Sequence, residues 1–154
     1  DITLVEFIDY KCGYCKKAHG EVEKLLSTDG NIRFIIKEFP ILGEDSLKMS
    51  KFALAVKIAH GDKAYKVVHD ILIKMKAAPS TKAFDRIINN LNLDKKLVQD
   101  AMESPEVKGI IADTRNLAEK LKISGTPTFV MKDELIRGYV PFDALIELVA
   151  NKRG

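Results

Sequence analysis

The two cysteines of the chain, Cys12 and Cys15, are three residues apart, and the pattern around them constrains the fold more than any other feature. They follow an apolar, β-branched stretch, 3–8, whose composition is typical of a buried strand. A helical pattern begins at Lys16, and a second apolar stretch, 32–39, predicts another strand. This order predicts a βαβ unit in which both thiols lie where the first strand ends and the helix begins.

The middle of the chain has helical patterns only. Apolar residues recur at helical spacing in 49–56 and in 64–75, with a break at 61–62. Asp94 and Ser104 then occupy positions typical of the N-caps of further helices. We therefore predict several amphipathic helices in succession, with no strand among them.

After this helical part the pattern returns to strands. Residues 126–131 predict a strand with Pro127 near its start, residues 134–140 a hairpin partner, and a last helix follows Pro141. Proline cannot donate a hydrogen bond to a sheet, so its place at a strand entrance requires a structural reason. No linker or repeat interrupts the chain, so we predict one α/β domain, 1–154, with a helical insertion between its two halves.

The composition excludes several functional classes. A length of 154 residues fits one domain, and 46% apolar with 31% charged residues is the balance of a globular protein. Lys and Arg number 25 against 22 Asp and Glu, and the net charge of +3 is too small to indicate nucleic-acid binding. No apolar run approaches the roughly 18 residues of a membrane span. We expect neither nucleic acid as a partner nor insertion into a membrane.

A CxxC pair has three common uses: it closes a disulfide, binds a soft metal such as Cu(I), or supplies half of a structural zinc site. The remaining candidate zinc ligands are only His19, His60 and His69, and no second pair has the spacing of a metal site. Beside a βαβ pattern, the pair favours thiol redox chemistry without a cofactor or a metal. The alternative is a Cu(I)-binding or metal-carrier module that uses the same two thiolates.

The position of each cysteine predicts its role. The free N–H groups and the dipole at a helix N-terminus favour an anion, so we expect Cys12 to be the thiolate nucleophile. Cys15, one turn further along, is then more buried and resolves the mixed disulfide by attacking Cys12. Gly13 adds no bulk over the thiolate. Tyr14 has two interpretations, an exposed contact for a partner or a side chain that packs on the helix.

Other polar residues near the pair have weaker signals. His19 is two turns after Cys12, and we expect a surface histidine without a role there. Lys11, Lys16 and Lys17 flank the cysteines, where they either favour the thiolate or form an ordinary solvated helix start.

Three features together resemble the DsbA-like branch of the thioredoxin superfamily, close to bacterial DsbA and ScsC-type proteins. They are the segment 7–15 with its Cys-Gly-Tyr-Cys sequence, the long helical insertion, and the segment Gly125-Thr126-Pro127-Thr128. The resemblance spans nearly the whole chain and implies a thioredoxin fold with an all-helical insertion, at about 44–122, between a βαβ half and a ββα half. It implies a protein thiol–disulfide oxidoreductase, an oxidase or an isomerase, in the bacterial periplasm. The resemblance also implies partners for such an enzyme: proteins with thiols or disulfides as substrates, and a redox partner that reoxidises or reduces the dithiol.

The resemblance also implies roles for individual residues. Pro127 is then cis and lies beside the cysteines, and Thr126 presents its backbone to a substrate peptide. From their place between the cysteines, we expect Gly13 and Tyr14 to contact the substrate as well. Glu6 corresponds to the buried acid that relays the proton of Cys15. From the residues alone, Glu6 is either buried with a raised pKa or faces solvent on an edge strand. The Gly-Tyr dipeptide differs from the Pro-His of the best-known strong oxidant, so oxidising power is not carried over.

Overall fold

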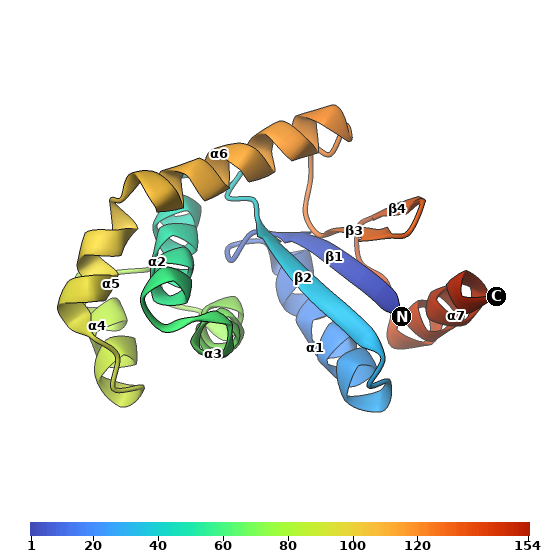
Figure 1. Ribbon diagram of the computed structural model, residues 1–154, viewed down its shortest axis with the longest axis horizontal. Coiled ribbons are helices and arrows are strands. Elements are labelled where there is room, and N and C mark those ends of the chain that lie inside the picture. The colour runs from blue at the N-terminus through green and yellow to red at the C-terminus, as the bar shows by residue number, and fades with distance from the viewer.

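A four-stranded sheet forms the centre of one half of the molecule in the computed structural model, which describes residues 1–154 (Figure 1). The strand order is β2-β1-β3-β4. Strand β1 (Ile2–Ile8) is parallel to β2 (Ile32–Glu38) and antiparallel to β3 (Thr128–Met131), which pairs with β4 (Glu134–Arg137). Strand β1 is therefore an interior strand with a partner on each side.

Helices cover both faces of the sheet. On one face, Leu4 packs in a core shared with α1 (Gly13–Thr28) and α7 (Phe142–Arg153). On the other face, Phe7 packs against residues of α6 (Pro105–Lys120) and of the loops beside it. The alternation along β1 follows from the two-residue period of a strand, whose successive side chains point to opposite faces.

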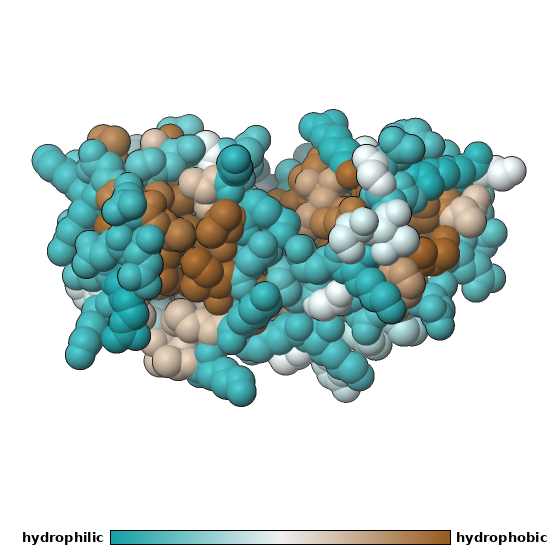
Figure 2. All heavy atoms as spheres, turned by 90° about the horizontal axis from the view of Figure 1, so that it is seen from below, coloured by the Kyte–Doolittle hydropathy of each residue, from teal (hydrophilic) through white to brown (hydrophobic).

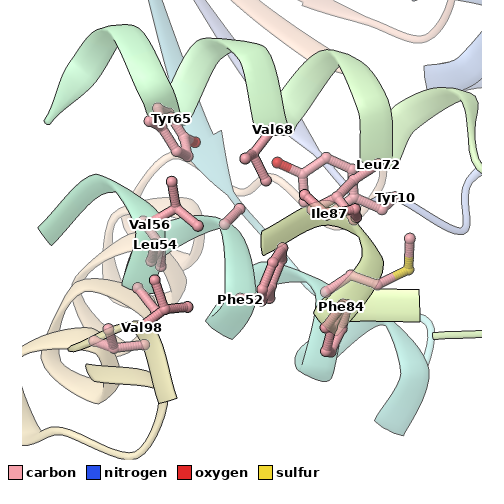
Figure 3. Close-up of a cluster of buried hydrophobic side chains, with 14 of the residues drawn as sticks. Tyr10, Phe52, Leu54, Val56, Tyr65, Val68, Leu72, Phe84, Ile87 and Val98 are labelled. Atoms are coloured by element: carbon pink, nitrogen blue, oxygen red, sulfur yellow. The ribbon is translucent and has the colours of Figure 1, made fainter. Parts of the chain in front are cut away.

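The helical insertion has a core of its own. It consists of α2 (Glu44–His60), α3 (Asp62–Lys74), α4 (Thr81–Asn90), α5 (Lys95–Met102) and α6, and α6 extends back over the sheet (Figure 1). The largest apolar cluster of the protein, 21 buried residues, lies here. Tyr10, in the turn after β1, inserts its ring among the helices of this cluster (Figure 3). Both cysteines belong to the same cluster.

The predicted helix starts in the insertion are confirmed. The Asp94 side chain accepts a hydrogen bond from the N–H of Leu97, and the Ser104 side chain accepts one from the N–H of Val107. These contacts satisfy amide groups that have no partner within the helix.

The two strands of the C-terminal hairpin are shorter than predicted. Strand β3 begins at Thr128 instead of residue 126, because Pro127 has no N–H to offer to the sheet. Strand β4 ends at Arg137 instead of residue 140, because Gly138 adopts a positive φ of 93° that interrupts extended backbone. Helix α1 begins at Gly13, three residues before Lys16, where the sequence pattern predicts its start.

The surface is mainly polar, with apolar side chains gathered over the helical insertion in the left half of Figure 2. Val67 and Ile71 of α3 are among the exposed apolar residues. None of the helices is both long and apolar enough to cross a membrane.

Candidate active site

Cys12 lies at the junction of β1 and α1, as predicted. It is the N-cap residue of α1, its N–H donates to the carbonyl oxygen of Asp9 at 3.0 Å, and its carbonyl oxygen accepts from the N–H of Lys16 at 3.1 Å. The thiol donates to the carbonyl oxygen of Thr126 at 3.2 Å. The residue as a whole is 9% exposed, and its sulfur lies beside the backbone of a distant loop.

The loop that contacts Cys12 contains the proline singled out in the sequence. The peptide bond between Thr126 and Pro127 is cis, as the resemblance implies. The carbonyl oxygen of Pro127 accepts from the N–H of Gly138 at 2.8 Å, and the Thr128 hydroxyl donates to the carbonyl oxygen three residues earlier, also at 2.8 Å. The loop is therefore held in place by the hairpin and positions the Thr126 backbone against the sulfur.

Cys15 lies one turn further along α1 and is 1% exposed. Burial raises the pKa of its thiol well above the ordinary value, and negative charge on Cys12 and Glu6 acts in the same direction. Both cysteines are free thiols, so the structure represents the dithiol form. Cys15 is thus the more buried of the two cysteines, as expected, with 1% of the residue exposed against 9% for Cys12.

Glu6 is buried in the sheet and does not lie on an edge, so the interpretation as an edge-strand charge is wrong. It is 3% exposed in the interior strand β1, and its two-residue spacing from Leu4 places it on the face that α1 covers. Burial raises the pKa of Glu6 from an ordinary 4.5 to about 8, and the charge of Glu23 adds to this. The Glu6 carboxyl is therefore mainly protonated at neutral pH, beneath the helix that carries Cys15.

Exposed residues follow Cys12 in the chain and also lie in a loop tied to the turn before it. Gly13 is exposed, and Tyr14 is 64% exposed, so the alternative that Tyr14 packs on the helix is wrong. Ile41 and Leu42, 37% and 55% exposed, lie in the loop after β2. The N–H groups of both donate to the buried carboxylate of Asp9, at 2.9 and 3.0 Å, which ties this apolar loop to the turn that precedes Cys12.

Two of the three flanking lysines make specific contacts. The Lys16 ammonium donates to the carbonyl oxygens of Ile73 and Met75, at 3.0 and 2.9 Å, where α3 ends. Burial lowers the pKa of Lys16. The Lys17 ammonium lies 4.4 Å from the centre of the Tyr139 ring. Lys16 therefore joins the active-site helix to the helical insertion, and neither of these two lysines is a simply solvated charge.

A buried polar network beside α1 was not predicted. His19 is 7% exposed, so the expectation of a surface histidine is wrong: α3 covers it, and its ring lies 5.7 Å from that of His69. The Tyr10 hydroxyl donates to Glu38 at 2.7 Å and lies 3.0 Å from Nδ1 of His69. Burial lowers the pKa of His69 to about 3 and raises that of Glu38 to about 7, although three hydroxyl groups donate to Glu38. The signal that drew attention to Glu6, an acid in an apolar strand, also applies to Glu38.

Asp9 is a further residue that sequence reasoning missed. It is fully buried, and its carboxylate accepts from the N–H of Lys11 at 2.8 Å and from the Ser46 hydroxyl at 2.7 Å, besides the two amides of the apolar loop. With four donors, this carboxylate fixes the turn that ends in Cys12. The only signal in the sequence was its place directly after a strand.

Residues 3–150 match the family described as DSBA-like thioredoxin domain. A thioredoxin-like oxidoreductase from Silicibacter pomeroyi is 38% identical, with a TM-score of 0.90 over 99% of this chain and 87% of that one. The thiol-disulfide exchange protein alpha-DsbA2 from Wolbachia pipientis is 28% identical, with a TM-score of 0.90 over 99% and 82%. A periplasmic thioredoxin-like protein from Salmonella enterica is 28% identical, with a TM-score of 0.82 over 98% and 83%. The arrangement of sheet and insertion is therefore the thioredoxin fold with a helical insertion that the sequence resembles.

The chain spans only a part of its first curated relatives. The chain is 26% identical over 144 residues to a Na(+)/H(+) antiporter, NhaA 3, of Salinispora tropica. The matching region makes up 94% of this chain but 22% of the antiporter. The similarity therefore concerns one portion of the antiporter polypeptide.

Proposed function

The chain belongs to the DSBA-like thioredoxin domain family, and on this premise we propose that Cys12 and Cys15 exchange disulfides with protein substrates. The observation that carries the proposal is the contrast between the two sulfurs. Cys12 caps a helix with its Sγ 3.2 Å from the carbonyl oxygen of Thr126, whereas Cys15 is enclosed one turn behind it. This is the arrangement that a nucleophile and a resolving thiol require.

The exchange proceeds in two displacements. The Cys12 thiolate attacks one sulfur of a substrate disulfide, the substrate S–S bond breaks, and the second substrate sulfur leaves as a thiolate that takes up a proton. Cys15 then loses its proton and attacks Sγ of Cys12, which forms the Cys12–Cys15 disulfide and releases the first substrate sulfur. The substrate gains two electrons and the dithiol loses two. Oxidation of a substrate dithiol is the same sequence reversed, after which a redox partner reoxidises the protein.

We assign Glu6 the role of proton acceptor and donor for Cys15. The high pKa of Cys15 means that its sulfur does not ionise unaided at neutral pH. A carboxyl with a pKa of about 8 on the face beneath α1 is partly ionised near neutral pH, and in that form it provides a base for the Cys15 proton where water is excluded. Glu6 acts through Cys15 and does not contact the substrate in this proposal.

The substrate lies over Cys12, with the backbone of Thr126 pairing with an extended peptide as an added strand does. Gly13 leaves the approach to the sulfur open, and Tyr14 supplies an exposed aromatic contact. We add the loop with Ile41 and Leu42 as an apolar contact, since it is tied to the same turn.

We place this activity in the bacterial periplasm. The compartment comes from the resemblance and from the Salmonella protein with the same fold. An oxidising compartment is also where protein disulfides persist.

The roles of the two cysteines are tested by trapping. Cys15→Ser leaves Cys12 without a resolving thiol, so mixed disulfides with a scrambled multi-disulfide protein should accumulate and be visible as adducts on a non-reducing gel. Cys12→Ser is the matched control and should trap little, because Cys15 is enclosed. Equal trapping by the two variants would reverse the assignment. Oxidation of a reduced substrate, measured beside refolding of a scrambled one, then distinguishes an oxidase from an isomerase.

A further inference from the structure

A second cluster of ligand-type side chains lies between α1 and α3 and begins one helical turn after Cys15. His19 of α1 meets His69 and Asp70 of α3, and one nitrogen or oxygen atom from each lies within 4.8 Å of the others. Nε2 of His19 is buried without a hydrogen-bond partner and lies 3.5 Å from Oδ1 of Asp70. A buried imidazole nitrogen without a partner is unfavourable and calls for an explanation.

The hydrogen bonds around His69 determine which of its nitrogens is free. The Tyr10 hydroxyl has one proton, which it donates to Glu38. Its oxygen therefore accepts from Nδ1–H of His69, 3.0 Å away. The proton of the neutral ring is then on Nδ1, and Nε2 carries the free lone pair. This is how metal-binding histidines are usually oriented, with the second nitrogen donating to a neighbouring group.

The surroundings are compatible with a cation. Lys66 lies 2.7 Å from both Glu23 and Asp70, so two carboxylates share one ammonium group. With two neutral imidazoles, the group formed by Glu23, Lys66 and Asp70 has one negative charge in excess, and the charge of Lys74 also acts on His19. The side chain of Asp70 is 32% exposed, which leaves a route from solvent to the two buried rings.

We propose that His19, His69 and Asp70 form a binding site for a divalent transition-metal ion of the Zn²⁺ class. Two imidazoles and one carboxylate suit Zn²⁺, and the fourth position of a tetrahedral ion would hold water. Tetrahedral zinc with ligand distances of about 2.0–2.1 Å places its ligand atoms about 3.3 Å apart, so ligand atoms that now lie within 4.8 Å of one another need to come closer on binding. Lys66 would release Asp70 and keep Glu23. This site uses neither cysteine and does not depend on the proposed redox function.

The test is a calorimetric titration of the full chain with Zn²⁺. The background is Cys12→Ser/Cys15→Ser, because thiolates bind zinc themselves. We expect one equivalent of Zn²⁺ to bind and its affinity to fall at least about tenfold in His19→Gln, in His69→Gln and in Asp70→Asn. His60→Gln removes the third histidine, which lies at the exposed end of α2, and should change the affinity by less than about twofold.

A second pair of variants tests the hydrogen bond to His69. Tyr10→Phe removes the acceptor of Nδ1–H and should weaken Zn²⁺ binding about 10- to 100-fold. Tyr65→Phe removes the other tyrosine hydroxyl that donates to Glu38, at 2.5 Å, and should leave the affinity unchanged.

A measurement without any ligand substitution completes the test, since a variant of a buried histidine can fail to fold. In the cysteine-free background, Zn²⁺ should shift the ring-nitrogen NMR signals of His19 and His69 and leave those of His60 in place. The proposal is overturned if this background binds no Zn²⁺, if His60 responds instead, or if folded His19→Gln and His69→Gln bind as tightly as their parent.

Discussion

Replacing Glu6 by Gln tests the burial of this carboxyl through its effect on stability. In the folded chain the pKa of Glu6 is about 8, against 4.5 ordinarily. Each pKa unit corresponds to about 1.4 kcal/mol, so the full shift amounts to about 5 kcal/mol. At pH 7 the unfolded carboxyl is ionised and the folded one is mainly protonated, so the raised pKa lowers the free energy of unfolding by about 3 kcal/mol. At pH 5 the same effect lowers it by about 1 kcal/mol.

The direction of the pH dependence follows from the pH range in which the folded and the unfolded chain bind the Glu6 proton. Between pH 4.5 and about 8 the folded chain retains the Glu6 proton that the unfolded chain has lost. The contribution of Glu6 to the free energy of unfolding is thus greatest below pH 4.5 and falls as the pH rises to 8. Glu6→Gln does not titrate, so its stability relative to the parent should increase by about 2 kcal/mol from pH 5 to pH 7. Burial of the uncharged amide changes the stability of the variant by the same amount at both pH values, so it does not affect the difference between pH 5 and pH 7.

The assay is urea unfolding of the reduced protein at pH 5, 6, 7 and 8, with the parent and the variant compared at each pH. Glu147→Gln, an exposed carboxyl on α7, is the matched control and should show no such trend. A stability difference for Glu6→Gln that stays constant over this range would refute the raised pKa. Without a raised pKa, Glu6 would no longer be suited to exchange a proton with Cys15.

Three further substitutions have definite expected effects. Asp9→Ala leaves several donors in and around a buried turn without an acceptor and should lower the free energy of unfolding by about 2–4 kcal/mol in a urea titration. Ser104→Ala removes the N-cap of α6 and should lower it by about 1 kcal/mol in the same assay. Tyr14→Ala should change stability by less than about 0.5 kcal/mol. Loss of a contact worth about 1 kcal/mol should nevertheless slow its exchange with a protein disulfide about fivefold, measured by stopped flow.

Each of these expectations has a control. Ser124→Ala, at an exposed loop position, should leave stability unchanged, and an equal loss there would remove the cap argument for Ser104. For Tyr14→Ala the control substrate is a small disulfide such as oxidised glutathione, whose rate should not fall. An Asp9→Ala variant as stable as the parent would mean that water replaces the carboxylate.

The local chemistry of the site could be predicted from the sequence because it is encoded in neighbouring residues. Cys12 and Cys15 stand between a strand pattern and a helix pattern, and each has the burial that this position implies. Pro127 attracted attention for a local reason as well, since a proline at a strand entrance is unusual. The contact between Cys12 and Thr126 joins residues 114 positions apart, and it was expected only from the family resemblance.

The remaining features depend on which elements meet in space. Glu6 is enclosed because β3 pairs with β1 from the far end of the chain and makes β1 an interior strand. His19 is buried because α3 packs over it, and the residues around His19 do not predict this contact between α1 and α3. Asp9 was missed because its role depends on distant residues: two of its four donors come from the loop after β2.

The packing of both sulfurs in the core of the insertion limits how the Cys-Gly-Tyr-Cys segment can be reused in protein engineering. Grafted onto a thioredoxin-type sheet that lacks α2 to α5, the same four residues would leave Cys15 uncovered and deprive it of the burial that raises its pKa. Conversely, a library of substitutions at Leu72 or Ile73 would alter the surroundings of the thiols from within the insertion, without any change to the motif. A designer who wishes to tune this dithiol therefore has to treat the insertion and the motif as one unit.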